Sequence, residues 1–259
     1  MQEEMLSTES RDFVTALASG LEVIQAFDAE HPRMTLSEVA SRTGMNRAKA
    51  RRFLLTLHAL GYVRKEQRYF ELAPRVLQLG YAFLSANNYQ GVIQQYLEEI
   101  TAETGESSSL GVLDGHDVTY VARSAAKHRL MAITLSVGTR LPAAYTSMGR
   151  ILLAQLSDEA LDHFLATITL EPFTDKTVTD VNELRHRIVE ARQQGYAISD
   201  QELDSGLRSI AVPVYDAKRH LMGAINISTN AARVDLDTLV NVYLPVIQSK
   251  VAHIGATIN

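Results

Sequence analysis

The stretch Thr35–Leu60, TLSEVASRTGMNRAKARRFLLTLHAL, predicts two helices joined by a glycine turn. Thr35 and Glu38 match the capping box S/T-x-x-E at the start of the first helix. Gly44 stands where the turn needs a left-handed residue, and Asn46 can cap the second helix. A short helix, a tight turn and a second helix are typical of a helix-turn-helix that reads DNA.

The second of these helices has an apolar side and a cationic side. Its apolar residues recur at helical spacing, which predicts that they face inward: Ala50, Phe53, Leu54, Leu57 and Leu60. The other side carries the residues that we expect at base edges or phosphates: Asn46, Arg47, Ala48, Lys49, Arg51 and Arg52. Thr35 and Ser37 are placed to donate to a phosphate, although for Thr35 simple capping explains the residue equally well. For Arg51, a phosphate contact and an ordinary surface charge are both open.

The flanking segments extend the helix-turn-helix into a winged domain over residues 11–72. Residues 11–28 predict a supporting helix whose apolar stripe runs from Phe13 to Phe27, and Pro32 ends it. Residues 62–72 predict a β-hairpin that turns near Glu66 and Gln67. The wing tip would carry Arg64, Lys65 and Arg68, which can reach phosphate or a minor groove. An ordinary surface ribbon is the alternative for this hairpin.

The charge distribution supports a nucleic-acid partner although the net charge of the 259 residues is −5. Residues 33–75 have a net charge of +7, and the segments before and after them each have −6. A basic segment between acidic ones is the footprint expected for phosphate binding. The chain has no cysteine, which excludes disulfides and thiolate chemistry. No stretch approaches about 20 apolar residues, and the acidic N-terminus does not resemble a secretory signal, so we expect a cytoplasmic protein that makes no membrane contact.

The rest of the chain predicts a linker helix and a second domain. Residues 73–87 begin with Pro74 and are apolar on more than one face, which favours burial in a homodimer over burial within one chain. Residues 88–259 predict a mixed α/β fold with a mainly antiparallel sheet. Hairpins are expected around residues 114–117 and across 209–228, a strand at 131–135 and a loop at 136–142. Helices are expected from Thr146, at 158–165, at 181–194 and from about 235 to 258.

The segment Gly195–Asp216, GYAISDQELDSGLRSIAVPVYD, resembles the signature of the IclR family of bacterial transcriptional regulators. Its pattern of a glycine, Asp or Ser, Glu, a small residue and an aliphatic-aromatic-acid ending is met at Gly195, Ser199, Glu202, Ser209 and Val214–Asp216. The upstream run GTRLPAAYTSMGRILLA is similar to a second landmark of the family, and its wording is closest to the Pca/Pob-type branch.

The resemblance implies a winged helix-turn-helix, a linker helix and a GAF-like effector-binding domain in a homodimer or homotetramer. Such a regulator binds double-stranded operator DNA, can contact RNA polymerase and controls aromatic hydrocarbon catabolism in response to a small carboxylic acid. In this branch that acid is an aromatic acid or β-ketoadipate, and a different small organic acid is the alternative. The residues implied for the effector site are Arg123, Met131, Tyr145, Thr146, Ser147, Met148, Ser199, Arg208 and Ser209. Arg123, Arg150 and Arg208 compete as the cation for the acid, and Glu202 is expected to be a structural acceptor.

Nothing in the sequence predicts an enzyme, a cofactor or a metal site. The eight histidines show no HExxH or other ligand spacing, and neither a G-x-S-x-G elbow nor a cysteine nucleophile is present. A hydrolase tethered to DNA and a winged helix that docks protein are the remaining alternatives. Salt dependence separates the last from a DNA-binding domain, because phosphate contacts weaken steeply with salt.

Overall fold

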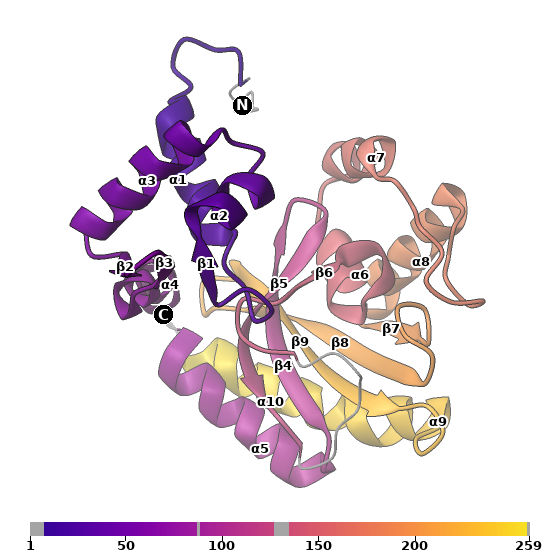
Figure 1. Cartoon of the computed structure of the whole chain (residues 1–259). Coiled ribbons are helices and arrows are strands. Elements are labelled where there is room, and N and C mark those ends of the chain that lie inside the picture. The colour runs from indigo at the N-terminus through magenta and orange to yellow at the C-terminus, as the bar shows by residue number, and fades with distance from the viewer. Residues whose placement is uncertain (1–7, 87–88, 127–134, 258–259) are drawn as a thin grey trace. The chain divides into compact units, whose positions relative to one another are not determined.

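The computed structural model describes residues 8–86, 89–126 and 135–257, and the chain divides into two units, residues 1–83 and 84–259 (Figure 1). The first unit is built on the predicted helix-turn-helix, with helices α1 (Thr15–Gln25), α2 (Leu36–Arg42) and α3 (Arg47–Ala59). The Thr35–Glu38 capping box is formed, Gly44 has a φ of 63°, and Asn46 Oδ1 accepts a 2.8 Å hydrogen bond from the Lys49 amide. The predicted helix starts and turn are therefore confirmed.

The wing is a three-stranded antiparallel sheet in the order β1-β3-β2. Its strands are β1 (Arg33–Thr35), β2 (Val63–Glu66) and β3 (Tyr69–Leu72). The predicted hairpin is confirmed, and its turn lies at Gln67 and Arg68, where Gln67 has a φ of 52°. Strand β1 was not predicted, because three residues are too short for alternation to stand out.

The predicted apolar sides of α1 and α3 are only partly right. The core of this unit takes Val23, Ala26 and Phe27 from the α1 region, and α3 adds Ala50, Leu54 and Leu57. The expected stripe residues Val14, Leu17 and Leu21 are exposed, as is Leu60, and Phe53 is half-buried. Periodicity finds an apolar stripe, but it does not show whether the same chain covers that stripe.

The linker begins with a 3₁₀ turn at Pro74–Val76 and continues as helix α4 (Leu77–Ala86). Leu77, Leu79, Tyr81 and Phe83 on α4 are exposed. Burial of these side chains in a homodimer stays a prediction.

The second unit contains a six-stranded antiparallel sheet in the order β6-β5-β4-β9-β8-β7. The strands are β4 (Ser107–Asp114), β5 (Asp117–Ser124), β6 (Arg140–Pro142), β7 (Ala197–Asp200), β8 (Leu207–Tyr215) and β9 (Leu221–Asn230). Both predicted hairpins are confirmed. The prediction of a loop at 136–142 is wrong at its end, because β6 pairs with β5 in the register Arg140↔Thr119. The strand predicted at 131–135 lies outside the described residues except for Leu135, which is not in a strand.

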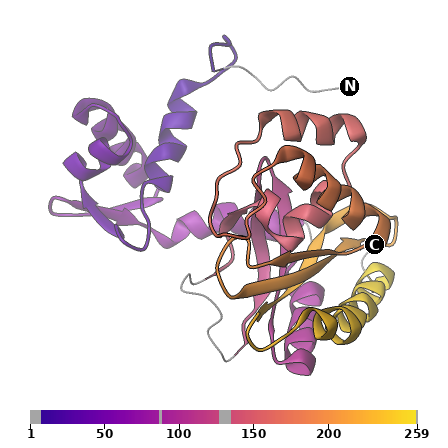
Figure 2. The same cartoon turned by 90° about the vertical axis from the view of Figure 1, so that its right-hand side faces the viewer.

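Helices cover both faces of this sheet (Figure 2). One face carries α6 (Ser147–Leu153), α7 (Asp158–Thr167) and α8 (Val181–Gln194). The other face carries α5 (Gln94–Thr104) and α10 (Leu244–Thr257), with the short α9 (Leu236–Thr238) before α10. The last helix is interrupted by a π-helical turn at Leu239–Tyr243. The mixed α/β class with a mainly antiparallel sheet is confirmed.

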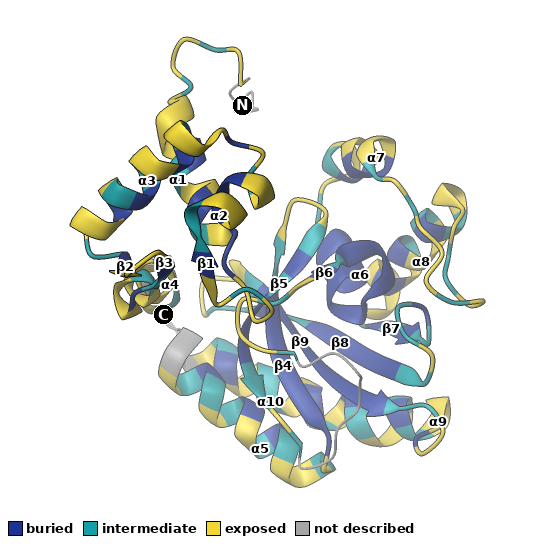
Figure 3. Cartoon of the chain, viewed as in Figure 1, coloured by how far each residue is buried: buried dark blue, intermediate teal, exposed yellow. Residues whose placement is uncertain are grey.

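Helix α6 is the most deeply packed helix of the second unit, since all seven of its residues are buried (Figure 3). Gly149 makes this possible, because a Cβ atom at this position would lie 2.0 Å from the Ala143 carbonyl oxygen. The glycine of the TSMGRILLA run therefore lets α6 lie directly against the 3₁₀ turn Ala143–Tyr145. This contact fixes the positions of Tyr145 and Thr146.

Candidate functional site

The cations of helix α3 are presented to solvent. Arg47, Arg51 and Arg52 are exposed and Lys49 is half-buried. None of these four side chains forms an ion pair or hydrogen bond with another residue in the described part of the chain. Ala48 is also exposed, as a contact to a thymine methyl group requires. Because these cationic side chains have no partner among the described residues, they are available to phosphates and base edges.

The start of α2 is occupied by its own cap. Thr35 Oγ1 accepts a 3.4 Å hydrogen bond from the Glu38 amide, and the Thr35 amide donates to Glu38 Oε2 over 2.6 Å. The hydrogen bond from the Thr35 amide lowers the pKa of Glu38. Capping thus accounts for Thr35, whereas Ser37 is exposed beside it.

The wing carries cations on β2 and in its turn. Arg64, Lys65 and Arg68 are exposed, and Arg68 donates to the Tyr69 hydroxyl over 3.0 Å. The guanidinium groups of Arg33 and Arg68 lie 5.0 and 5.1 Å from the centre of the Tyr69 ring. Arg33 also pairs with Glu66, which neutralises the one acid at the wing tip. The sequence reasoning missed Arg33 because it missed strand β1.

The second unit has a small cavity beside Thr146, the residue that caps the start of α6, with about 10 Å³ of space that water could occupy. Four of the predicted effector residues line it, namely Tyr145, Thr146, Ser199 and Ser209. The remaining lining residues are Tyr120, Leu135, Leu141, Leu203, Leu207, Asn226 and Ser228. Hydroxyls and an amide therefore face leucine and tyrosine side chains, which is the composition of a site for a small, partly apolar ligand.

The register of the sheet explains why these polar groups meet. Ser199 pairs with Ser209, Ser209 with Ser228, and Ser228 with Ser107, which places four serines in one row across four strands. Residues directly opposite each other in a sheet point to the same face. Asn226 is two residues from Ser228 on β9 and therefore shares this face. The row brings together serines that are far apart in the sequence.

Ser147 supports this row from α6. Its hydroxyl donates to Ser209 Oγ over 2.8 Å, and both residues are buried. Ser199 Oγ donates to the Tyr145 carbonyl over 2.7 Å. Thr146 Oγ1 accepts from the Gly149 amide over 3.0 Å, so it caps its own helix. The expected hydroxyl-rich rim is present, although much of its hydrogen-bonding capacity holds the protein together.

Two of the three candidate cations are engaged elsewhere. Arg150 forms a buried pair with Glu202 through its two terminal guanidinium nitrogens, and Arg150 Nε donates to the Ala144 carbonyl over 3.1 Å. Arg208 pairs across the strands with Asp200 and donates to the Val234 carbonyl. Because side chains alternate along β8, Arg208 lies on the opposite face of the sheet from Ser209. The structure therefore brings neither arginine to the cavity, and Glu202 has the structural role expected of it.

Arg123 is not among the residues that line the cavity either, but its surroundings differ from those of these two arginines. It pairs across the strands with Ser109, and its guanidinium donates to Ser109 Oγ over 2.9 Å. Ser109 in turn pairs with Asn226, so Arg123 lies on the cavity face of the sheet. Partial burial lowers the pKa of Arg123, and no carboxylate in the described ranges forms an ion pair with it. A partly desolvated cation without an acid partner is suited to an anionic ligand.

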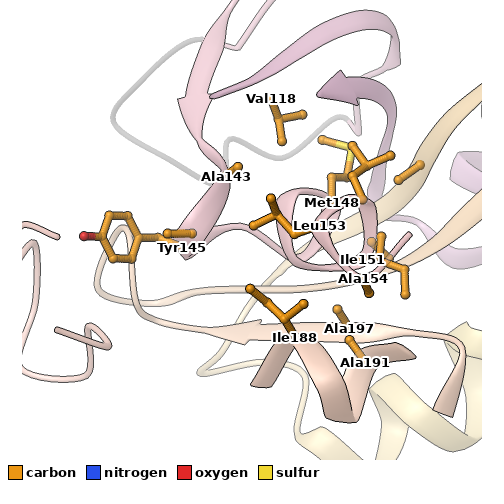
Figure 4. Close-up of a cluster of buried hydrophobic side chains, with 14 of the residues drawn as sticks. Val118, Ala143, Tyr145, Met148, Ile151, Leu153, Ala154, Ile188, Ala191 and Ala197 are labelled. Carbon is orange, nitrogen blue, oxygen red and sulfur yellow. The ribbon is translucent and has the colours of Figure 1, made fainter. Parts of the chain in front are cut away.

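Among the described residues predicted for the effector site, Met148 does not line the cavity. Met148 is fully buried and packs in the apolar cluster with Val118 and Ile151 (Figure 4). In the same view the Tyr145 ring points away from Met148. Met131 lies outside the described residues. Met148 is thus part of the core, whereas the family resemblance implied that it contacts the effector.

Sequence reasoning missed Tyr120, Asn226 and Ser228. Tyr120 is buried, and desolvation raises its pKa to about 12, so it stays a neutral hydroxyl at physiological pH. Asn226 and Ser228 alternate with isoleucines in the segment Ala224–Ser228, AINIS. Polar residues at every second position of an otherwise apolar strand are the signal that could have found them.

Two other classes of site are absent from the described ranges. They contain no cluster of His, Cys, Asp or Glu residues that could hold a metal ion. They also contain no helix long and apolar enough to cross a membrane.

Comparison with protein families gives two matches. Residues 16–67 match the IclR helix-turn-helix domain, and residues 81–254 match the bacterial transcriptional regulator IclR C-terminal domain. The two matched ranges contain α3 and the lined cavity, respectively.

Individual relatives agree with these matches. The chain is 43% identical over 240 residues to the Pca regulon regulatory protein of Pseudomonas putida, covering 93% of this chain and 82% of that protein. A transcriptional regulator from Rhodococcus sp. RHA1 has a solved structure with 45% identity and a TM-score of 0.82, covering 94% of this chain and 97% of that one. A double mutant of the inducer-binding domain of PobR from Acinetobacter, solved with 3-hydroxybenzoic acid, has 30% identity and a TM-score of 0.59, covering 63% of this chain and 95% of that one. The chain therefore belongs to the IclR family of bacterial transcriptional regulators, in the branch of the Pca and Pob regulators.

Proposed function

We propose that this regulator binds operator DNA with α3 and the wing, and that a small carboxylic acid from aromatic catabolism binds in the cavity at the start of α6 and changes the affinity for the operator. The observation that carries the proposal is the cavity on the same sheet face as Arg123, together with α3 cations that have no partner among the described residues. In this proposal residues 11–72 bind DNA, residues 73–87 link and dimerise, and residues 88–259 bind the effector. The protein acts in the cytoplasm, where bacterial operators are found.

For DNA, we assign base and phosphate contacts to the exposed residues of α3 and the wing. Arg47, Arg51 and Arg52 can pair with guanine or phosphate, and Ala48 can lie against a thymine methyl group. Lys49 is half-buried and is better placed for a phosphate beside the helix. Arg64 and Arg68 on the wing, with Ser37 at the start of α2, would fix the register on the duplex through phosphate contacts.

For the effector, we assign Arg123 as the partner of the carboxylate. A carboxylate beside this guanidinium would form the ion pair that no carboxylate among the described residues provides. Tyr145, Leu141 and Leu203 would form the apolar walls. The cavity holds about one water at its present size, so binding of an aromatic acid requires the side chains around it to move.

For assembly, we assign a homodimer through an apolar groove of the first unit. The groove has a volume of about 760 Å³ and is lined by α1, α3 and α4, including Leu17, Leu21, Leu60 and Leu79. All four leucines are exposed, and an apolar patch of this kind marks an interaction site. A second copy of the chain fits it, because two linked winged helices match a palindromic operator. Pairing of dimers into a tetramer, and contact with RNA polymerase at the promoter, are further assignments of this proposal.

The test is an operator titration with the full-length protein. Duplexes selected from a random pool give the operator, and affinity is then measured against salt concentration, with and without 4-hydroxybenzoate, protocatechuate or β-ketoadipate. We expect affinity to fall steeply with salt and one of the acids to change it, because an effector must bind one arrangement more tightly than another.

Arg52→Ala should weaken operator binding at every acid concentration, and Lys218→Ala serves as a matched control, since Lys218 is an exposed cation on the second unit. Equal binding by Arg52→Ala and the natural protein would remove α3 from the interface. Unchanged operator affinity and promoter output with all of these acids would remove the effector assignment.

A further inference from the structure

An ion pair connects strand β1 to the tip of the wing across strand β3. Arg33 on β1 pairs through Nη2 with Glu66 at the end of β2, and β3 lies between these two strands. The guanidinium carbon of Arg33 lies 5.0 Å from the centre of the Tyr69 ring on β3, a distance suited to a cation–π contact. The other two guanidinium nitrogens of Arg33 make no hydrogen bond to any residue that the structure describes. Arg33 therefore keeps donors free for another anion.

Arg33 and the Tyr69 ring lie on the face of the wing that is turned away from the hydrophobic core. Their neighbours Met34 and Phe70 are buried in that core, and successive side chains of a strand point to opposite faces. Thr35, which pairs across the strands with Tyr69, caps helix α2, so this face of the wing borders the start of α2. The proposed function assigns phosphate contacts to that region, and Arg33 is placed to add one.

The ion pair is easily exchanged, because both of its side chains are exposed. The side chain of Arg33 is 44% exposed and that of Glu66 is 70% exposed. An ion pair this exposed stabilises a protein only weakly, whereas a contact between a cation and a DNA phosphate also releases counterions from the duplex. A phosphate that comes within reach of Arg33 can therefore displace Glu66 from the guanidinium.

From this arrangement we infer, building on the proposed function, that Arg33 is a phosphate contact and that Glu66 restricts this contact to the operator. In the free protein, Glu66 keeps Arg33 paired over Tyr69 and places a negative charge at the tip of the wing. When α3 binds its operator sequence, the wing is held against the backbone, and a phosphate replaces Glu66 at the guanidinium. DNA of unrelated sequence lacks the base contacts that hold the wing there, so the ion pair persists and Glu66 repels the backbone. Specificity arises in this way by penalising the wrong partner.

Titration of full-length variants with operator and random-sequence duplexes at several salt concentrations tests this inference. Each phosphate contact contributes about 0.9 to the slope of log affinity against log salt concentration. Arg33→Ala should lower the slope on the operator by about one and leave the slope on random DNA unchanged. Glu66→Gln should raise the slope on random DNA by about one, because the released Arg33 then contacts a phosphate there as well. The ratio of operator affinity to random-DNA affinity should fall by about threefold or more in this variant.

Two further variants separate this account from a general effect of charge. Glu190→Gln removes the same charge from an exposed position on α8 and should change neither slope. The double variant Arg33→Ala with Glu66→Gln should return the slope on random DNA to its natural value, because the cation that Glu66 holds is gone. Thermal unfolding of each variant, followed by circular dichroism, checks that the wing substitutions leave the protein folded.

Other results would contradict the inference. An unchanged operator slope for Arg33→Ala would show that Arg33 contacts no phosphate. An equal gain on both duplexes for Glu66→Gln that persisted in the double variant would show that Glu66 acts only as a negative charge. In either case the proposed function would stand as long as Arg52→Ala still weakened operator binding. If the affinity of the natural protein for its operator did not depend on salt, the inference and the proposed DNA contacts would fall together.

Discussion

At the scale of single residues, the buried pair Arg150–Glu202 is the strongest local constraint around the cavity. Arg150 is 3% exposed and Glu202 is 7% exposed. The arginine joins Glu202 to the carbonyls of Ala144 and Ile198. Those contacts connect α6, which Thr146 caps, with the turn that contains Tyr145 and with β7, which contains Ser199. The pair therefore holds the residues that line the cavity in place, although neither Arg150 nor Glu202 lines the cavity itself.

Removing one partner should cost far more than removing both. Glu202→Leu leaves a buried guanidinium without its acid, and we expect a loss of about 3–5 kcal/mol in the free energy of unfolding. Arg150→Met combined with Glu202→Leu should restore most of that loss, because an apolar pair needs no charge compensation. Urea unfolding followed by circular dichroism measures both variants. Arg187→Ala, which removes an exposed ion pair with Glu183, should cost at most about 1 kcal/mol; a similar cost for Glu202→Leu would contradict this account.

At the scale of elements, the close approach of α6 to the turn Ala143–Tyr145 depends on Gly149. Gly149→Ala would place a methyl group against the backbone of Ala143, and backbone cannot move aside as a side chain can. We expect a loss of about 3 kcal/mol or more in unfolding free energy, together with weaker acid binding because Tyr145 and Thr146 shift. Gly80→Ala is the control, since nothing lies within 4 Å of a Cβ atom there, and it should be neutral or stabilising. Full stability of Gly149→Ala would show that α6 can retreat from the turn.

The elements also show how far sequence reasoning reaches. The capping residues Thr35 and Asn46 and the two long hairpins were predictable, because each carries a local signal of spacing or turn chemistry. Strands β1 and β6 were not predictable, because three residues hold their place only through pairing with β3 and β5. At the cavity, Ser199 and Ser209 followed from a family pattern. The place of Asn226 at the cavity could not be predicted, because strand register brings together residues that are far apart in the sequence. The pairing of Arg208 with Asp200 could not be predicted either, because it depends on which face of the sheet each β8 side chain occupies.

At the scale of the whole molecule, the chain combines a basic segment with acidic flanks, and its first unit exposes an apolar groove that α3 helps to line. Lys49 and Arg52 of α3 line the same groove as Leu17 and Leu21 of α1. A second copy seated in the groove would therefore also fix the orientation of α3. Operator affinity and self-association should consequently be linked in this protein, since a dimer positions two recognition helices at once.

Charge placed in the groove tests that linkage. Leu17 is 64% exposed and Leu21 is 45% exposed, so Leu17→Glu and Leu21→Glu should leave the fold of one chain intact. Each should shift the sedimentation profile from dimer toward monomer and weaken operator binding by about tenfold or more, because a buried carboxylate without a partner opposes association. Binding of the acid to the second unit should not change. Leu221→Glu, at an exposed leucine of β9, should alter none of these quantities. If the Leu17 and Leu21 variants stayed dimeric with full operator affinity, the groove would not be the interface, and the pairing of two winged helices would have to arise elsewhere in the chain.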